Sequence, residues 1–375
     1  MKKNVYAIID GQAGSCGKGK VIGQFALDHD VDVAIANCLP NAGHTVVKDG
    51  KQRVFHNIPV SAINLDTKLF IGAGSAIDMN VLAKEYAENE DILRNREIIV
   101  HPLVPLIEER HILKEQQNIR SGSTFKGGGA CLAEKIMRYS ELKFFKEFEN
   151  IKVRENYHEI LLKSLKEARK VLLEGSQGCD LDLNHSRHYP YVTSRSVGVS
   201  QMLSDSGISP KSLQQVIMVI RPFPIRISNT TNIQKKIYSG DYGNSQELSW
   251  EKINIAAYFE QYPTVVLEGQ LDDQANLLIH DFTELTTVTK QKRRVFDIDI
   301  NQLKQNIAIN TPDYIYLNFF QHLGLEYADM QGHFDELYIH KHAREYVNWL
   351  EEELAVPIDY LGTGADYKAY VKRKR

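Results

Sequence analysis

The sequence has no apolar run long enough to cross a membrane, because a spanning helix needs about 20 consecutive apolar residues. The apolar run at residues 5–9 ends at Asp10 and is also too short for a signal peptide. Cysteine is scarce, and no pair has the C-x-x-C spacing of a zinc ribbon or a thioredoxin-like site. The four cysteines are Cys16, Cys38, Cys131 and Cys179. We expect free thiols in a reducing compartment, and therefore a cytoplasmic protein with no membrane partner.

Basic residues are not in excess either, since the net charge is −3 and the pI is near 6.5. Proteins that coat nucleic acids usually carry a basic excess, so no nucleic-acid partner is expected. The chain is 43% hydrophobic and 25% charged, which is typical of a globular protein. Internal repeats and low-complexity linkers are absent. Although 375 residues could form about two or three domains, we expect one large domain over residues 1–375.

Apolar segments and helical segments alternate along the chain, which predicts an α/β fold. Its large central sheet is expected to be mostly parallel, with helices on both faces. The expected strands are residues 5–9, 31–35, 70–72, 97–100, 171–174, 215–221, 314–319 and 358–361. The expected helices are residues 21–28, 112–117, 132–148 and 337–354. Residues 227–290 are rich in Asn, Thr, Gln and Tyr and are expected to form a loop-rich, irregular insertion.

The first strand leads into the glycine-rich sequence G-Q-A-G-S-C-G-K-G-K at residues 11–20. Glycines let backbone N–H groups converge on an anion, and the following helix points its positive end there. The segment is not a Walker A motif, because Val21 stands where that motif requires Ser or Thr. It is either a phosphate-binding loop or a glycine turn between a strand and a helix.

A second loop, N-A-G-H-T at residues 41–45, follows the second expected strand. His44 could act as a general acid near neutral pH. The alternative is a partly buried structural histidine, and this alternative is favoured when the segment is considered alone.

Together these two loops resemble the adenylosuccinate synthetase family, whose corresponding loops read G-D-E-G-K-G-K and N-A-G-H-T. Further segments resemble family segments in the same order. They are residues 122–129 followed by Lys135 and Arg138, residues 174–178, residues 189–194, Thr286 and Thr287 followed by Arg293 and Arg294, and residues 362–366. The resemblance covers most of the chain and implies a single adenylosuccinate synthetase-like, P-loop-related domain.

The resemblance also implies a ligase reaction. In the family, a base removes the N1 proton of a purine monophosphate, and O6 then attacks the γ-phosphate of a triphosphate. The amine of L-aspartate displaces phosphate from the 6-phosphoryl intermediate. Mg²⁺ bridges the triphosphate oxygens.

Site residues are implied position by position. The catalytic residues would be Ser15 and His44, with His44 stabilising charge on the transferring phosphoryl group. Triphosphate-binding residues would be Gly14, Ser15, Gly17, Lys18, Gly19, Gly43, His44, Thr45, Asn318, Gly362 and Gly364. Purine monophosphate-binding residues would be Ser15, Asn41, Ser123, Thr124, Arg138, Gln177, Thr193 and Arg226. Aspartate-binding residues would be Thr286, Thr287, Thr289 and Arg293, and the Mg²⁺ ligands would be Ser15 and the carbonyl of Gly43. Arg138 matches a family arginine that reaches the site of the neighbouring subunit, so the resemblance implies a homodimer.

The sequence departs from the family at Ser15, which replaces the aspartate that serves as the base. Serine does not titrate near pH 7 and is a poor base. One interpretation is an inactive nucleotide-binding protein, and another is a conventional enzyme acting on IMP. The favoured one is a changed purine, because serine could face the 2-amino group of guanine. This resembles the phage branch of the family, which condenses dGMP with aspartate on the route to 2-aminoadenine (Z) DNA and would place the protein in host cytoplasm.

A second departure is Asn318, which stands where the family segment T-K-L-D has the aspartate that reads guanine in GTP. An amide both donates and accepts, which suits adenine. The sequence therefore predicts ATP or dATP as the triphosphate, and the alternative is a structural asparagine at a strand end.

Overall fold

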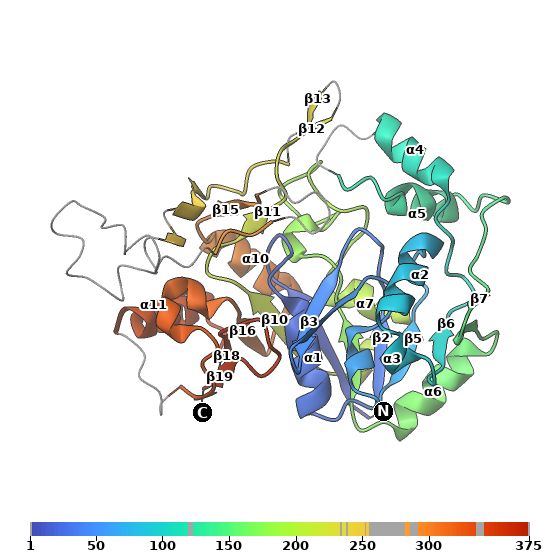
Figure 1. Cartoon of the computed structure of the whole chain (residues 1–375), viewed down its shortest axis with the longest axis horizontal. Helices are drawn as coiled ribbons and strands as arrows, with labels where there is room; N and C mark the ends of the chain where they lie inside the picture. Colours follow the sequence, from blue (N-terminus) through green and yellow to red (C-terminus); the bar gives the residue numbers. More distant parts are fainter. Residues whose placement is uncertain are drawn as a thin grey trace.

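The computed structural model describes residues 2–118, 123–232, 235–237, 239–251, 253–254, 282–285, 292–334 and 341–373. Its centre is a 12-stranded sheet with the strand order β17-β19-β18-β16-β10-β1-β9-β2-β5-β6-β8-β7 (Figure 1). The strands in the middle of the sheet are all parallel, and the antiparallel pairs β18–β19 and β7–β8 lie toward its two ends. The predicted α/β fold with a mostly parallel sheet is confirmed.

The strands in the middle of the sheet coincide with the apolar runs of the sequence. They are β1 (Val5–Asp10), β2 (Val33–Ala36), β5 (Lys68–Ile71), β6 (Ile98–Val100), β9 (Val171–Glu174), β10 (Leu213–Ile220), β16 (Tyr314–Leu317) and β18 (Ile358–Gly362). The remaining strands of this sheet are β7 (Glu147–Phe148), β8 (Ile151–Val153), β17 (Gly332–His333) and β19 (Tyr370–Lys372). Parallel strands that are buried on both faces are expected to be apolar throughout rather than alternating.

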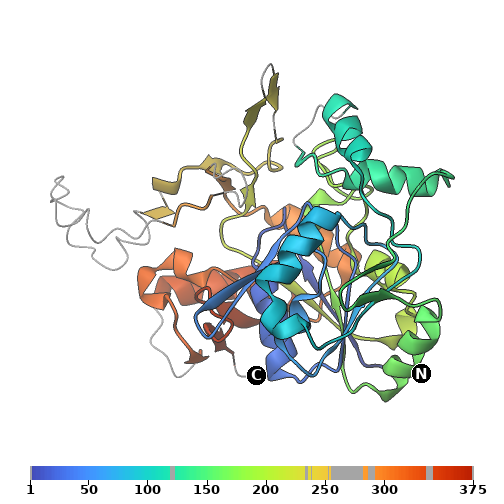
Figure 2. The same ribbon diagram turned by 45° about the vertical axis from the view of Figure 1, so that its right-hand side comes forward.

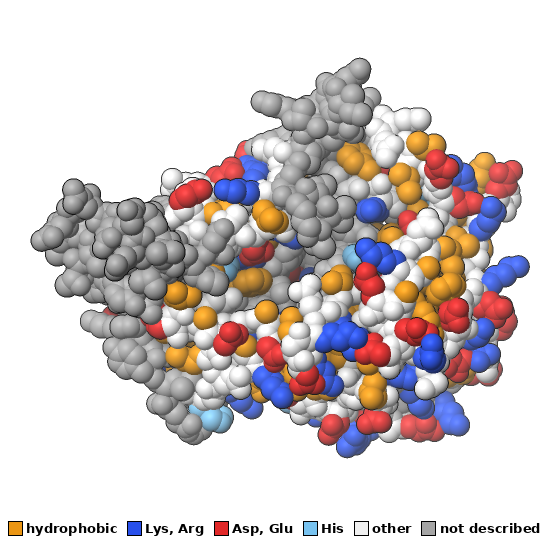
Figure 3. All heavy atoms as spheres, in the orientation of Figure 1, with side chains coloured by type: hydrophobic (Ala, Val, Ile, Leu, Met, Phe, Trp, Pro, Cys, Tyr) orange, Lys and Arg blue, Asp and Glu red, His pale blue; other side chains and the backbone are white. Residues whose placement is uncertain are grey.

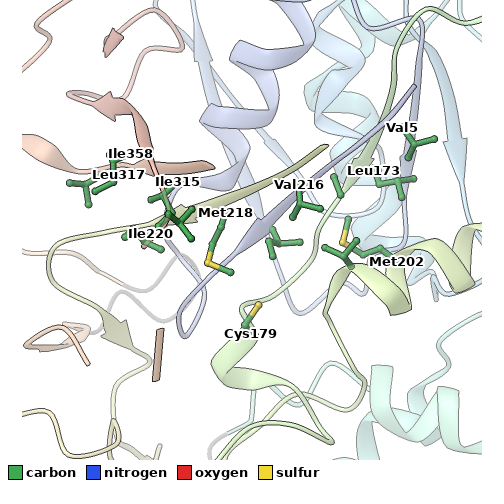
Figure 4. Packing of buried hydrophobic residues seen from close by; sticks show 14 of the residues in the cluster. Val5, Leu173, Cys179, Met202, Val216, Met218, Ile220, Ile315, Leu317 and Ile358 are labelled. Carbon is green, nitrogen blue, oxygen red and sulfur yellow. The ribbon is translucent and has the colours of Figure 1, made fainter. Parts of the chain in front are cut away.

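Helices cover both faces of the sheet. One hydrophobic cluster joins β1 residues Val5 and Ile9 to α6 (Tyr157–Glu167), α7 (Val199–Ser206), α10 (Ile300–Asn310) and α11 (Lys341–Leu354). Figure 4 shows part of this packing, with Met202 of α7 among strand residues. A second cluster joins Ile8 to α1 (Lys18–Asp28), α2 (Met79–Glu88) and α3 (Glu90–Leu93) on the other face. Successive strand side chains therefore enter opposite cores, as the two-residue period requires.

The sequence placed one helix wrongly. Residues 132–148 were expected to form one helix. The observed helix α5 (Gly128–Ile136) begins earlier and ends at Ile136, and residues 147–148 form β7. Arg138 adopts a left-handed backbone conformation with φ 56°, which a continuing helix cannot accommodate. The expected helix at 337–354 is confirmed as α11 from Lys341, while residues 335–340 lie outside the described residues. α4 (Glu109–Asn118) matches the expected helix at 112–117.

One hairpin was missed although the sequence carries its signal. β3 (His44–Lys48) pairs antiparallel with β4 (Lys51–Phe55) through the turn residues Asp49 and Gly50. Both turn residues have positive φ, which is the conformation that an Asp-Gly hairpin turn requires. The first residue of the hairpin is His44, which was predicted from the sequence to be catalytic.

Short antiparallel strands lie within the segment expected to be an insertion, residues 227–290, and directly on either side of it. β11 (Ile225–Arg226), β14 (Glu247–Leu248) and β15 (Arg294–Phe296) form one sheet, and β12 (Thr230–Asn232) pairs with β13 (Lys235–Ile237). In Figure 1 the β12–β13 hairpin stands at the top of the view, and β11 and β15 lie lower and to its left; Figure 2 shows the hairpin projecting from the molecule. Residues 255–281 lie outside the described residues, so the insertion and the single domain stay predictions. No described helix is long and apolar enough to span a bilayer.

Candidate active site

The predicted loops converge at the carboxyl ends of the parallel strands. β1 leads into the glycine-rich loop 11–17, β2 into the loop that contains residues 41–43, and β9 into the loop 175–178. Arg221 directly follows β10, and Asn318 directly follows β16. Ligands of open α/β sheets bind at this edge.

Asp10 organises the glycine-rich loop from beneath. Its fully buried carboxylate accepts the backbone N–H groups of Gln12 at 3.0 Å, Gly14 at 3.2 Å and Cys16 at 3.0 Å. These three N–H groups therefore face the protein rather than a ligand. Ser15, between them, has a left-handed backbone with φ 58° and an exposed side chain. The loop thus presents Ser15 to the open side of the site.

The two lysines after the loop point in different directions. Lys18 is 4% exposed, and its Nζ lies 3.3 Å from Asp10 Oδ2 and 2.8 Å from the carbonyl oxygen of Gln177. It therefore joins the glycine-rich loop to the loop after β9. Lys20 donates to the carbonyl of Ala369, and burial lowers its pKa to about 7. Lys20 therefore faces the C-terminal loop that carries Ala369.

His44 lies next to this loop and is uncharged at neutral pH. Its side chain is 8% exposed, and burial, together with the nearby charges of Lys18 and His56, lowers its pKa to about 3. A Cβ at Gly19 would lie 2.4 Å from the carbonyl oxygen of Thr45, so α1 begins in direct contact with β3. The glycine-rich loop and residues 43–45, predicted to share the triphosphate, are brought together.

Buried polar atoms without partners mark the predicted purine site. Asn41 Oδ1, Ser176 Oγ and Thr193 Oγ1 have no hydrogen-bond partner among the described residues. A buried polar group left unpaired costs about 1–3 kcal/mol, so such a group indicates a place for a ligand or water. Arg226, 6% exposed, donates to the carbonyl of Tyr191 at 3.0 Å and so lies beside the segment that carries Thr193.

Gln177 and the glycine-rich loop are neighbours. A Cβ at Gly178 would lie 2.1 Å from the carbonyl oxygen of Gln12, so only glycine permits this approach. Gln177 itself has a left-handed backbone with φ 66°. Ser123 caps a short turn by accepting the N–H of Phe125 at 3.1 Å. Thr124, next to it, is exposed.

Asp180 ties several of these segments together. Its fully buried carboxylate accepts Tyr242 Oη at 2.5 Å, Gln302 Nε2 at 2.7 Å and Asn306 Nδ2 at 2.5 Å. Asn306 also donates to the carbonyl of Gly11 at 2.9 Å, which links α10 to the glycine-rich loop. Burial raises the pKa of Asp180 to about 6.

The predicted aspartate loop reaches Ser15. Arg293 Nη1 donates to Ser15 Oγ at 2.7 Å. Arg221, fully buried, donates to the Ser15 carbonyl at 3.1 Å, forms an ion pair with Glu284 and lies 4.0 Å from the centre of the Phe319 ring. Sequence reasoning missed the roles of Arg221 and Glu284. A charged residue directly after the buried strand β10 was the available signal.

The other predicted aspartate-binding residues are Thr286, Thr287 and Thr289, and they lie outside the described residues.

Asn318 lies between the glycine-rich loop and the C-terminal glycines. It is 3% exposed, and its Nδ2 donates to the carbonyl of Cys16 at 2.9 Å. A Cβ at Gly362 would lie 2.0 Å from Asn318 Oδ1. Asn318, Gly17 and Gly362 are therefore brought together as predicted. Gly364 lies on the same C-terminal loop, with the side chain of Asp329 beside it.

Arg138 behaves differently from the other predicted residues. It is exposed just after the end of α5, next to the exposed apolar side chains of Ile136, Met137 and Tyr139. In Figure 3, acidic and basic side chains alternate over the described part of the face shown. The described part of this face therefore shows no single basic patch (Figure 3).

Comparison with known proteins agrees with this geometry. The model of the adenylosuccinate synthetase family matches residues 7–161 and 141–339. The N6-succino-2-amino-2'-deoxyadenylate synthase of Acinetobacter phage SH-Ab 15497 is 31% identical over 360 residues, covering 86% of each chain. The adenylosuccinate synthetase of Methanocaldococcus jannaschii is 30% identical over 368 residues, covering 96% of this chain and 94% of the relative.

A solved structure is similar over nearly the whole chain. It is the succinoaminodeoxyadenylate synthetase of cyanophage S-2L, bound to dGMP and dATP as an energy donor. The TM-score is 0.79 at 26% identity, with 99% of this chain and 96% of that chain covered. With the loops, the sheet and these matches in agreement, the chain belongs to the adenylosuccinate synthetase family and is a carbon–nitrogen ligase driven by a nucleoside triphosphate.

Proposed function

We propose that the protein condenses dGMP with L-aspartate, using ATP or dATP, through a 6-phosphoryl purine intermediate. The product is 2-amino-2'-deoxy-N6-succinyladenylate, a precursor of 2-aminoadenine DNA. The observation that carries the proposal is Ser15, exposed at the position of the family base and hydrogen-bonded to Arg293. The phage relatives, named for this product, and the neighbour bound to dGMP and dATP support it.

Ser15 selects the purine in this proposal. A serine hydroxyl has one donor and two acceptor lone pairs, and Arg293 uses one lone pair. The other lone pair can accept from the 2-amino group of guanine. IMP lacks the 2-amino group, so a site built for that group would leave a polar atom unpaired. The cost of about 1–3 kcal/mol corresponds to roughly five- to 150-fold discrimination against IMP.

The triphosphate site uses charge and position rather than covalent chemistry, which is what phosphoryl transfer requires. Lys18 supplies positive charge between the glycine-rich loop and the loop 175–178, which carries Gln177. Neutral His44 can donate a hydrogen bond to the transferring phosphoryl group as negative charge develops there. The beginning of α1 points backbone N–H groups toward the phosphates.

Asn318 selects the triphosphate in this proposal. Its side chain is packed between Cys16 and Gly362, with the amide nitrogen toward a carbonyl oxygen. An aspartate in that place would set a carboxylate against the same carbonyl. The arrangement therefore favours an amide at this position, and an amide suits adenine in ATP or dATP.

Of the two predicted Mg²⁺ ligands, the Gly43 carbonyl suits the ion and Ser15 does not. Oxygen ligands suit this ion, which keeps several waters and binds mainly through substrate phosphates. The carbonyl of Gly43 is such a ligand. Ser15 Oγ already accepts from the Arg293 guanidinium, and a second cation there would be repelled. We propose Gly43 and the triphosphate as the ligands of Mg²⁺, which supplies positive charge at the phosphates when bound.

A homodimer is proposed from the surface around Arg138. The exposed apolar residues Ile136, Met137 and Tyr139 flank it. A solvent-exposed apolar surface of this kind suits contact with a second copy of the chain. Analytical ultracentrifugation should give a dimer for the wild-type protein and a larger monomer fraction for Met137→Asp.

The function is tested by offering IMP, GMP and dGMP in separate reactions with aspartate, Mg²⁺ and either dATP, ATP or GTP. Succinylated product is detected by mass. We expect product from dGMP with dATP or ATP. Product from IMP alone would establish the conventional enzyme, and no product with any nucleotide would establish a nucleotide-binding protein.

A further inference from the structure

Two guanidinium groups approach Ser15 from different parts of the chain. Arg293 donates to its hydroxyl at 2.7 Å, and Arg221 donates to its carbonyl at 3.1 Å. Two carboxylates of the described residues lie around Ser15, and both are paired. Asp10 lies beneath the loop with Lys18 and three backbone N–H groups, and Glu284 forms an ion pair with Arg221. The described residues around Ser15 therefore supply cations and hydrogen-bond donors rather than a free base.

We propose that Arg293 acts through Ser15 as a positioning residue that stabilises the purine after it has lost its N1 proton. No side chain then has to serve as the base. The proposal rests on the proposed function, because it assigns the step that the missing family aspartate would perform.

The chemistry balances without a protein base. The N1–H bond breaks, its electron pair stays on the purine, and the proton passes to solvent water. The negative charge spreads to O6, which forms a bond to the γ-phosphorus while the bond from that phosphorus to the β-phosphate oxygen breaks and the nucleoside diphosphate leaves. A nearby positive charge lowers the pKa of an acid by about 1–3 units, so Arg293 makes the anion more accessible near neutral pH.

Ser15 can follow this change because of how Arg293 holds it. Before ionisation, its free lone pair accepts from the 2-amino group next to N1. After ionisation, its hydroxyl hydrogen can turn toward N1, since Arg293 still occupies only one lone pair. Titratable and charged groups around Ser15 are Arg293, Arg221, Glu284, Asp10, Lys18 and Cys16.

The direct test is the N1 pKa of bound dGMP, measured by NMR with dGMP labelled with ¹⁵N at N1 and no triphosphate present. In wild-type enzyme the bound pKa should lie about 1 unit or more below that of free dGMP. Arg293→Gln should return it toward the free value, and Arg293→Lys, which keeps the charge, should fall between. Lys292→Gln is the matched control. It removes an adjacent cation whose side chain is 68% exposed and should leave the bound pKa at the wild-type value.

The pH dependence of kcat/KM for dGMP gives a second readout. The wild-type rate should rise with pH to a plateau, and the breakpoint should move to higher pH in Arg293→Gln. If Arg293→Gln keeps the wild-type bound pKa and breakpoint and only raises KM for aspartate, Arg293 binds aspartate alone and the proposal is overturned. Wild-type enzyme that makes no product from dGMP would instead overturn the proposed function, and this inference with it.

Discussion

Arg293 and Ser15 lie 278 positions apart in the chain, and Nη1 of the arginine donates to Oγ of the serine at 2.7 Å. One residue belongs to the expected aspartate loop and the other to the phosphate loop. Their contact places the residues predicted to bind two different substrates within one hydrogen bond of each other. A ligase that joins aspartate to a purine needs this proximity, because positioning lowers the barrier to the joining step.

Restoring the carboxylate at the phosphate loop should restore the family's purine. Ser15→Asp gives the N1–H of IMP an acceptor and gives Arg293 a charged partner. We expect the ratio of kcat/KM for IMP to that for dGMP to rise by roughly five- to 150-fold. Ser15→Ala is the control and should weaken dGMP use without improving IMP. Steady-state kinetics measure both, and an unchanged ratio in Ser15→Asp would refute the role of Ser15.

Lys18 and Lys20 provide a matched pair, since both are 4% exposed and lie two residues apart. Lys18→Gln removes the positive charge between the glycine-rich loop and the loop 175–178, and it should lower kcat by about 100-fold or more. Lys20→Gln removes a contact to the Ala369 carbonyl and should lower kcat by less than about tenfold, with its main effect on thermal stability. Equal losses of kcat in the two variants would contradict this division.

Asn318→Asp should damage use of dATP and ATP. The new carboxylate would face the carbonyl oxygen of Cys16, which now accepts from the amide at 2.9 Å. We expect KM for dATP to rise about tenfold or more, and the ratio of GTP to dATP turnover to increase. Kinetics with each triphosphate at saturating dGMP test this. A variant with wild-type preference would show that Asn318 does not read the base.

Asp180 should make folding stability depend on pH. Its pKa is about 6 in the folded protein, raised by burial, against an ordinary value of 3.8, so the folded state binds more protons between these values. Its contribution to stability is complete below pH 3.8 and is lost as pH rises through 6, by on the order of 3 kcal/mol.

Asp180→Asn removes this titration, so the stability of wild type relative to the variant should fall between pH 4 and pH 7. Urea unfolding at both pH values measures it. Tyr242→Phe removes a donor that lowers the pKa of Asp180, so it should make the decline steeper. An equal difference in stability at the two pH values would contradict the account of Asp180.

Much of the fold and several site residues could be predicted because their signals are local. The loop after β1 and the loop that leads to His44 each follow an apolar strand, and parallel strands bring their carboxyl ends to one edge. The motifs that carry Lys18, Asn41 and Thr193 were recognised in this way, and the binding roles of these residues stay predictions.

Long-range contacts carried no such signal. Glu284 pairs with Arg221 63 positions away, and Asp180 is held by Tyr242 and Asn306 from separate elements. The prediction of a helix over residues 132–148 was wrong beyond Ile136 for a related reason. Its apolar residues Ile136 and Met137 are exposed rather than packed in a helix–core contact, so their spacing did not report burial.

The most direct test of the account follows the oxygen at C6 of the purine. The enzyme is given dGMP labelled with ¹⁸O at O6, together with aspartate, dATP and Mg²⁺, and the released phosphate is analysed by mass; ¹⁸O-labelled IMP is run in parallel. The account predicts ¹⁸O in the phosphate released from dGMP, with a succinylated 2-aminopurine nucleotide formed in equal amount, and much slower labelling from IMP. Unlabelled phosphate, or labelling from IMP alone, would contradict it.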